Sequence, residues 1–285
     1  MSQMKREKKM NNEGFVKKLN EKMTRLINKS TMVEQAMAYS LLSAGKRIRP
    51  VLIKLICEDM GVQEDLIWNP AMAVELFHTA SLIHDDLPQI DDSPLRRGRP
   101  SCHVVFGNDM AILAGDGLML MAFCVLNQTP ADPVSKSMLF DLFSKSTYDV
   151  LIGEAMDVEF TGKEKNINDV IEMYRKKTGA LFSFCFAIGA ILMKKLEYLE
   201  KLINVGSTFG VWFQIVDDLK DVSGKDENVG KTTGRDKALG KPTVVNIMGI
   251  QEAKNFADNL YESVIVQLKS LSLNKVVDFL CALRE

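Results

Sequence analysis

The stretch SLIHDDLPQIDDSPLRRGRPSCH, residues 81–103, decides how the rest of the sequence is interpreted. It places four aspartates and three arginines within fifteen positions, directly after the apolar run 71–82. That run predicts a helix whose C-terminal end presents Asp85 and Asp86, because Pro88 prevents the helix from continuing regularly. Since the helix dipole disfavours anions at a C-terminus, the paired carboxylates indicate a site for a cation.

A second acidic cluster follows another apolar helix, in FQIVDDLKD, residues 213–221. Asp217 and Asp221 are four residues apart and share one helix face, where unpaired like charges repel. Either cluster alone also fits a solvated helix end that neighbouring Arg and Lys neutralise. Two oxygen-only clusters together favour Mg²⁺, whose remaining ligands are water and phosphate oxygens, over an all-protein Ca²⁺ site.

Basic residues form two groups, one upstream of the first helix and one after its aspartates. GKRIRP, residues 45–50, supplies Lys46, Arg47 and Arg49, and Arg96 and Arg97 follow the first aspartates. The planar fork of arginine matches phosphate oxygens in bidentate fashion, so the two basic groups predict two phosphorylated groups. The adjoining acids and the lack of interleaved aromatics argue against a nucleic acid. We expect these opposite charges to bind ligands rather than to neutralise one another.

The rest of the chain predicts an all-α fold. Apolar residues recur at helical spacing, as at Phe15, Leu19 and Met23, and strand-like alternation is almost absent. Asp132-Pro133 reads as a helix start, and no proline follows it before Pro242. The connections are short and none resembles an interdomain linker, which predicts one domain over residues 1–285. The exception is the glycine-containing segment 223–241, whose length predicts a functional loop.

The composition excludes several function classes. The 285 residues carry 36 Lys and Arg against 37 Asp and Glu, which gives no global bias toward nucleic acid or membrane. Five cysteines are scattered without a CxxC pair, as expected of a protein in the reducing cytoplasm. The apolar stretch 180–193 is short for a membrane span and predicts a buried core helix.

Together these motifs resemble the trans-prenyl diphosphate synthases. HDDLPQIDDSPLRRGRPSCH looks like their first aspartate-rich motif, in the DDxxxxD form with a two-residue insertion and a following RRG. FQIVDDLKD looks like the second motif, DDxxD, and GKRIRP like the upstream basic motif. The resemblance implies a helical bundle around a central cavity, a homodimer, and a magnesium-dependent reaction that joins isopentenyl diphosphate to an allylic diphosphate.

The resemblance also implies roles for individual residues. The ligands of three magnesium ions per active site would be Asp85, Asp86, Asp91, Asp217, Asp218 and Asp221. Isopentenyl diphosphate would bind Lys46, Arg49, His78 and Arg97. Further substrate contacts would come from Arg96, Lys177, Thr178, Gln214, Lys231 and Lys241, the last two in a lid that closes over the allylic diphosphate. The catalytic set would be Asp85, Asp86, Asp91, Arg96, Lys177, Asp217, Asp218 and Lys231.

The sequence departs from the family pattern in a few places. Ser93-Pro94 stands where many members continue with acidic residues, and Lys220 puts a positive charge inside the second motif. Glu154, upstream of Asp157, replaces a common glutamine. A terpene cyclase would share the first motif but lack the isopentenyl site, and a non-catalytic synthase subunit would typically have lost its aspartates.

Product length depends on the helix before the first motif. In the family, an aromatic residue five or four positions before the first aspartate stops growth at farnesyl; here these positions hold the small Ala80 and Ser81. The next bulky side chain inward is Phe77, about one helical turn or 5.4 Å deeper. The sequence therefore predicts geranylgeranyl diphosphate as the main product, with farnesyl diphosphate as the alternative.

Overall fold

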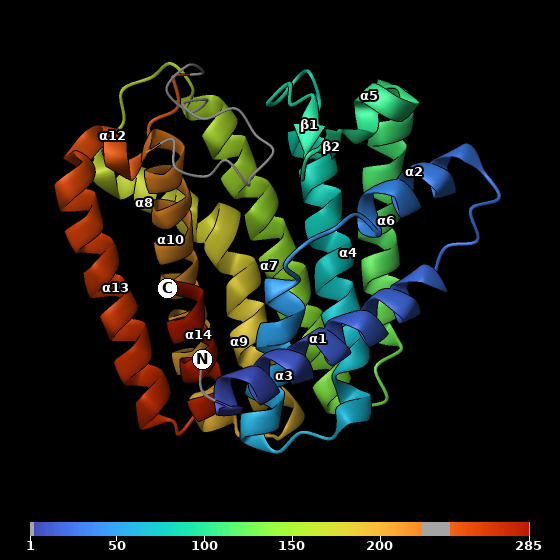
Figure 1. The fold of residues 1–285 in the computed structure, drawn as a ribbon, viewed down its shortest axis with the longest axis vertical. Coiled ribbons are helices and arrows are strands. Elements are labelled where there is room, and N and C mark those ends of the chain that lie inside the picture. The colour runs from blue at the N-terminus through green and yellow to red at the C-terminus, as the bar shows by residue number, and fades with distance from the viewer. Residues whose placement is uncertain (1–2, 224–239, 285) are drawn as a thin grey trace. The chain divides into compact units, whose positions relative to one another are not determined.

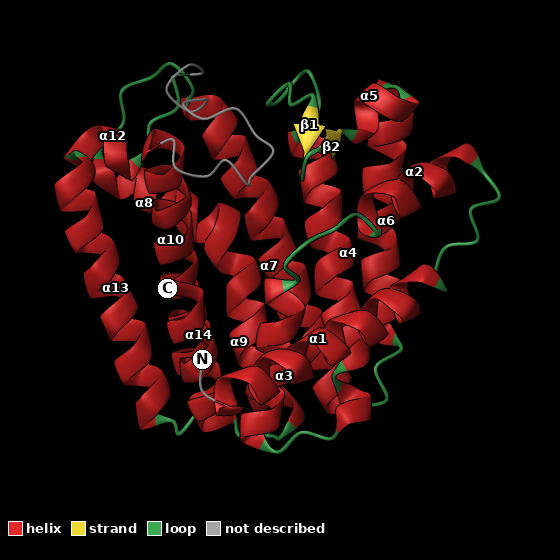
Figure 2. Cartoon of the chain, viewed as in Figure 1, coloured by secondary structure: helices red, strands yellow, loops and turns green. Residues whose placement is uncertain are grey.

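The computed structural model describes residues 3–223 and 240–284, and these are helical almost throughout (Figure 1, Figure 2). Among them the strands are β1, Leu95–Arg96, and β2, Arg99–Pro100, which pair in one short antiparallel hairpin. The predicted all-α class is confirmed. The chain divides into two compact units, residues 1–54 with 63–131, and residues 55–62 with 132–285. The prediction of a single domain stays a prediction.

The first unit is built around the aspartate-bearing helix α4. Its elements are α1 (Gln3–Thr24), α2 (Met32–Leu41), the start of α3 (Ile48–Met60), η1 (Glu64–Leu66), α4 (Trp68–Asp85), the hairpin, α5 (Cys102–Phe106) and α6 (Asn108–Asn127). Helix α2 begins with a capping box, because Thr31 and Glu34 each accept a hydrogen bond from the other's backbone N–H, at 3.3 and 2.9 Å.

Helix α4 ends where the sequence predicts, at Asp85, two residues before Leu87-Pro88. The chain then folds back on this end, because the N–H of Asp91 donates to the carbonyl of Asp85 at 3.0 Å and that of Ser93 to Asp86 at 3.1 Å. On its other side α4 packs closely on α6, where a Cβ at Gly115 would lie 2.1 Å from Nε2 of His84. The aspartates thus sit on a helix end that is held from two sides.

The second unit presents the other acidic group at the end of α10. Its elements are the end of α3, α7 (Pro133–Phe160), α8 (Ile167–Tyr174), η2 (Arg175–Gly179), α9 (Ala180–Leu192), η3 (Leu196–Tyr198), α10 (Leu199–Ser223), α12 (Val244–Met248), α13 (Ile250–Ser270) and α14 (Asn274–Arg284). Asp132 caps α7 and Pro133 occupies its first turn, as predicted. Every residue of α9 from 181 to 192 is buried, which confirms the predicted core helix.

One turn of π-helix, η2, is clamped between two neighbouring helices by glycines. A Cβ at Gly153 of α7 would lie 2.1 Å from the backbone nitrogen of Lys177. On the opposite side, a Cβ at Gly210 of α10 would lie 2.3 Å from Cα of Gly179. Since neither contact leaves room for a side chain, three backbones meet at this turn.

Helix α6 is apolar and only partly buried. By length and composition it qualifies as a membrane span, with a mean hydropathy of 1.8, and 39% of that window is buried. A core helix of a soluble protein passes the same test. The prediction that the chain has no stable membrane span therefore stays a prediction.

The glycine clamp makes a stability prediction. Gly153→Ala forces a methyl group into the backbone of η2 and should lower the free energy of unfolding by about 3 kcal/mol or more. Gly14→Ala is the matched control, because a Cβ there meets nothing within 4 Å. At this exposed position of α1 it should raise stability by about 0.5–1 kcal/mol, since alanine is the better helix former. Chemical denaturation measures both; equal effects would contradict the clamp.

Candidate active site

The aspartates of the first group differ in exposure. Asp85, the last residue of α4, and Asp91, in the returning loop, are partly exposed, and the backbone bond described above ties their chain segments together. Asp86 is buried, at 2% exposed. Of the three predicted magnesium ligands in this group, two therefore have carboxylates accessible to a cation, and the third is buried.

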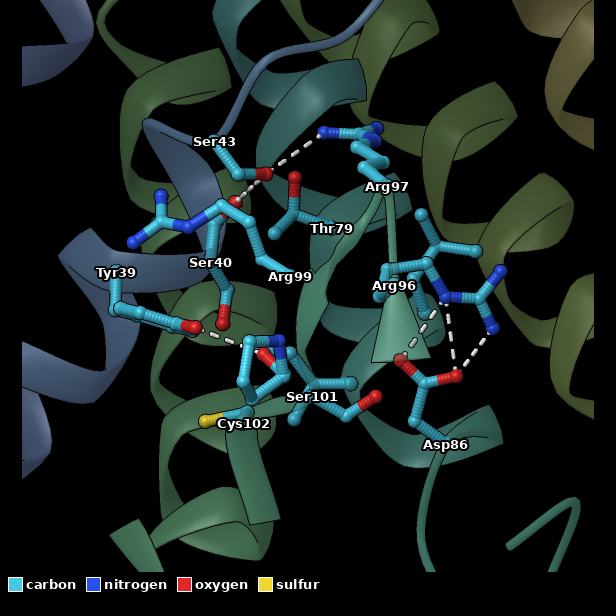
Figure 3. A pocket seen from close by; sticks show the side chains of 13 residues that line it. Tyr39, Ser40, Ser43, Thr79, Asp86, Arg96, Arg97, Arg99, Ser101 and Cys102 are labelled. Atoms are coloured by element: carbon cyan, nitrogen blue, oxygen red, sulfur yellow. Dashed lines mark hydrogen bonds and ion pairs between the residues drawn. The ribbon is translucent and has the colours of Figure 1, made fainter. Parts of the chain in front are cut away.

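The buried Asp86 binds Arg96 of the hairpin. Nε of Arg96 lies 3.0 and 2.9 Å from the two carboxylate oxygens, and Nη2 also donates to Oδ1, as Figure 3 shows. Burial alone would lower the pKa of Arg96, but these bonds and the charges of Asp86, Asp85 and Asp91 raise it. The expectation that the charges of this stretch do not neutralise one another is wrong for this pair, because the hairpin places Arg96 over the end of α4.

The basic motif divides into inward and outward residues. Arg47 is buried, and its Nη1 lies 2.6 Å from Oε1 of Glu75 in α4. Lys46 is exposed and Arg49 is partly exposed, so these two remain accessible to a ligand. Sequence reasoning grouped Arg47 with them; the signal that separates it is Glu75, a lone acid inside the apolar run 71–82.

Arg97 joins the two basic groups of the sequence. Its Nη1 donates to Oγ of Ser43 at 3.1 Å, and its guanidinium packs on Gly45, where a Cβ would lie 2.9 Å from Cζ. A pocket lies beside these residues, lined by α2, α4, the hairpin and the start of α5 (Figure 3). The structure thus brings Arg97 to the basic motif that carries Lys46.

The environment of the predicted substrate residue His78 favours its neutral form. Burial, and then the positive charges of Arg49, Arg97, Arg96 and Arg47, lower the pKa of the ring well below its usual value. His78 therefore contributes a hydrogen-bonding ring rather than a charge, and the surrounding guanidinium groups supply the positive potential.

In the second unit Asp217, Asp218 and Asp221 again differ in exposure. Asp217 is exposed and Asp221 partly exposed, whereas Asp218 is buried at 3%. The hydroxyl of Tyr174 donates to Oδ2 of Asp218, and Nε2 of Gln214 donates to Oδ1 at 3.1 Å. As in the first group, two accessible carboxylates lie beside one that the protein itself engages.

Gln214 also reaches the π turn, because Oγ1 of Thr178 donates to its Oε1 at 2.9 Å. At the far end, the N–H of Val244 donates to the hydroxyl of Tyr174 at 3.3 Å. A chain of hydrogen bonds therefore runs from η2 through α10 and α8 to α12. It fixes Thr178, Gln214 and Asp218 relative to one another; Tyr174 carried no sequence signal.

The lysines predicted to bind substrate converge on Asp157 of α7. Nζ of Lys177 lies 2.6 Å and Nζ of Lys241 lies 2.7 Å from the same carboxylate oxygen. Glu154, one turn earlier, adds an oxygen 2.8 Å from Lys177. Lys231 lies outside the described residues. The departure at Glu154 thus gives Lys177 a second anionic partner where the family often has a neutral amide.

The π turn explains how adjacent residues serve different helices. Single π turns inside α-helices are frequent at functional sites. Here Lys177 reaches α7 and Thr178 reaches α10 from neighbouring positions of η2. Because of this turn, Lys177 pairs with Asp157 of α7 while the adjacent Thr178 bonds Gln214 of α10.

The predicted chain-length residues lie on α4. Ala80 is fully buried and Phe77 is buried, three residues earlier. Ser81 is partly exposed, and its hydroxyl donates to the carbonyl of His78 at 3.0 Å. Positions 80 and 81, five and four residues before Asp85, therefore both carry small side chains.

The donors in both groups suit magnesium. Within residues 3–223 and 240–284, no group of three or more His, Cys, Asp and Glu side chains is placed to hold a metal ion by itself. Mg²⁺ usually binds through one or two carboxylates and keeps several waters or phosphate oxygens. Pairs of accessible carboxylates therefore fit Mg²⁺ that is shared with a phosphorylated substrate.

Comparisons with known proteins identify the family. The polyprenyl synthetase family model matches residues 30–276. Geranylgeranyl pyrophosphate synthase 4 of Arabidopsis thaliana is 38% identical over 252 residues, which cover 86% of this chain and 67% of the relative. Farnesyl diphosphate synthase of Escherichia coli is 37% identical over 271 residues, 91% of each chain.

Solved structures share the fold. The geranyltranstransferase of Thermotoga maritima matches with a TM-score of 0.84 and 42% identity over 94% of this chain and 95% of that chain. A geranyltransferase of Helicobacter pylori, solved with magnesium and isoprenyl diphosphate, matches with a TM-score of 0.79 and 30% identity over 88% and 86%. The chain belongs to the polyprenyl synthetase family. Within that family it is a short-chain trans-prenyltransferase.

The shared carboxylate of Asp157 makes stability depend on pH. Burial alone would raise its pKa, but Lys177 and Lys241 lower the pKa below 3.8. A lowered folded-state pKa stabilises the fold above the unfolded value, and this contribution is lost as pH falls through the folded value. Asp157→Asn should therefore lower the free energy of unfolding at pH 7 by about 2–3 kcal/mol.

Below about pH 4 the difference between wild type and Asp157→Asn should shrink. Asp141→Asn, on the same helix, is the control. Asp141 pairs with Lys145 at 2.8 Å, and both side chains are exposed to solvent. This substitution should change stability by less than about 0.5 kcal/mol. Urea titrations between pH 3 and 8 measure this; a constant difference would contradict the assignment.

Proposed function

We propose that the chain condenses isopentenyl diphosphate head to tail with allylic diphosphates and that its main product is geranylgeranyl diphosphate. The observation that carries the proposal is the repeated arrangement of accessible carboxylates at the C-terminal ends of α4 and α10, each with cationic side chains in the same unit. A diphosphate substrate that binds together with magnesium suits both parts of that arrangement, because the metal ion binds the carboxylates and the phosphate oxygens bind the cationic side chains.

In this proposal Asp85, Asp91, Asp217 and Asp221 bind magnesium, and their exposure admits a hydrated ion. Asp86 and Asp218, also predicted ligands, hold the surrounding side chains in place. When bound, magnesium would neutralise the diphosphate and act as a Lewis acid. The number of ions, three in the family resemblance, stays part of the proposal.

The protein's own cations act on the leaving group. As the allylic C–O bond breaks, Arg96, Lys177 and Lys241 donate hydrogen bonds to the diphosphate, on which negative charge develops. The double bond of isopentenyl diphosphate then attacks the allylic carbon, and the departing diphosphate accepts the proton that the isopentenyl unit loses. Lys46, Arg49, His78 and Arg97 hold the second diphosphate. Water must be excluded, because it would quench the allylic cation.

The reaction itself tests the proposal. The purified chain with Mg²⁺ and labelled isopentenyl diphosphate should elongate dimethylallyl, geranyl and farnesyl diphosphates, and EDTA should abolish this. Asp85→Asn and Asp217→Asn should each lower kcat by at least about 100-fold, because each removes charge where the leaving group is stabilised. Asp141→Asn should leave kcat unchanged. An inactive wild type would favour the non-catalytic subunit, and turnover of an allylic diphosphate alone would favour a cyclase.

Farnesyl diphosphate is the alternative product, because relatives named for each product match this chain about equally well. The small, buried Ala80 supports the longer product. Ala80→Tyr should shift the products to farnesyl diphosphate. The tyrosine ring would occupy the space of about one helical turn between position 80 and Phe77, which the proposal assigns to the last prenyl unit. Ser81→Phe provides a second variant at a partly exposed position, where folding is less at risk.

Chromatography of the dephosphorylated products measures the shift, and circular dichroism confirms that each variant folds. The longer product should remain dominant in Ser144→Phe, at a partly exposed position of α7. Unchanged products from both folded α4 variants would contradict the assignment of chain length to this helix.

We also propose a cytoplasmic homodimer that binds neither nucleic acid nor membrane. Exposed apolar side chains on α6 support the dimer, among them Ile112, Leu113 and Leu120, of which the last is 70% exposed. A helix with this composition requires cover, and a second copy of the chain would supply it. The oligomeric state in solution tests this assignment.

A further inference from the structure

The hydroxyl of Ser43 is oriented by the end of α2. Ser43 follows the last residue of that helix by two positions, and its Oγ donates to the carbonyl of Ser40 at 2.8 Å. The carbonyls in the last turn of a helix lack intrahelical partners. The carbonyl of Ser40 accepts this bond together with one from the backbone N–H of Ser43, at 3.3 Å. A serine hydroxyl has a single proton, and therefore its lone pairs are directed elsewhere.

One of those lone pairs accepts a hydrogen bond from Arg97. Nη1 of Arg97 donates to Oγ of Ser43 at 3.1 Å, and Figure 3 shows the two side chains directed at one another. Among the described residues this is the side-chain hydrogen bond that Arg97 makes. Because arginine carries five N–H donors, one bond to Ser43 fixes the guanidinium and leaves the rest of the fork for a ligand.

The close approach of the backbone leaves Arg97 little freedom. A Cβ at position 45 would lie 2.9 Å from both Cζ and Nη1 of Arg97, so the guanidinium lies directly on the backbone of Gly45. Arg97 itself has a φ of 53°, in the left-handed region. The guanidinium is thus placed by Gly45 and oriented by Ser43.

We propose that Ser43 is a positioning residue that orients Arg97 toward the diphosphate of isopentenyl diphosphate. The inference rests on the proposed function, which assigns that diphosphate to Arg97. A bidentate contact depends on the plane of the guanidinium, because its two N–H groups must point at two phosphate oxygens together. Loss of the Ser43 bond frees rotation of that plane and weakens this substrate selectively.

The test compares three variants in the full-length enzyme. Ser43→Ala should raise KM for isopentenyl diphosphate about 10- to 100-fold, the scale of one hydrogen bond to a charged group. KM for the allylic diphosphate should change less than about twofold. Ser43→Thr keeps the hydroxyl and should restore KM to within about threefold of wild type.

Ser40→Ala is the matched control in the same pocket. Its hydroxyl donates to the carbonyl of Ala36 at 3.2 Å, and the backbone carbonyl that Ser43 uses is retained. It should leave both KM values unchanged. Titration calorimetry with isopentenyl diphosphate alone should show the same order of affinities, which separates binding from turnover.

The possible failures can be told apart. If wild type neither binds nor consumes isopentenyl diphosphate, the proposed function is wrong. If wild type is active and Ser43→Ala has an unchanged KM, or if both substrates weaken equally, or if threonine does not restore binding, the positioning role alone is wrong.

Discussion

The first unit depends on one buried charge pair. Arg47 and Glu75 have side chains that are 1% and 2% exposed, and isolating either charge there would be costly. The guanidinium of Arg47 also donates to the carbonyls of Leu41 and Ser43, at 2.6 and 3.2 Å. The pair therefore ties the end of α2 to α4 and shapes the segment between α2 and α3. Lys46, Arg49 and Ser43 lie where they do because that segment is pinned from inside.

The two units use the same electrostatic principle. In each, cations proposed to meet substrate are already held by carboxylates, Arg96 by Asp86 and Lys177 by Asp157. Groups that are oriented before substrate arrives need little rearrangement when charge develops, and this preorganisation strengthens their effect. The buried aspartates thus orient the cations while the accessible ones remain available to a metal ion.

The C-terminal end of α4 and the start of α7 could be predicted from sequence, because proline and helix-capping residues act locally. The burial of α9 followed from its unbroken apolar run. Which of the three cations in GKRIRP turns inward could not be read from the motif, since it depends on Glu75 in another helix. The same holds for Asp86 and Asp218, whose partners come from the hairpin and from α8, and for the π turn, which depends on glycines in two neighbouring helices.

The π turn also constrains the number of residues in η2. Each residue of a helix turns the following side chains by about 100°. Removing one residue from η2 would rotate α9 by that amount, so that its buried face would point in another direction. The side chains of Lys177 and Thr178 could then no longer reach α7 and α10 together. The core of the second unit and its proposed phosphate contacts therefore share one register. This segment should tolerate substitutions far better than single-residue insertions or deletions, and changes in length should accumulate in the loops instead.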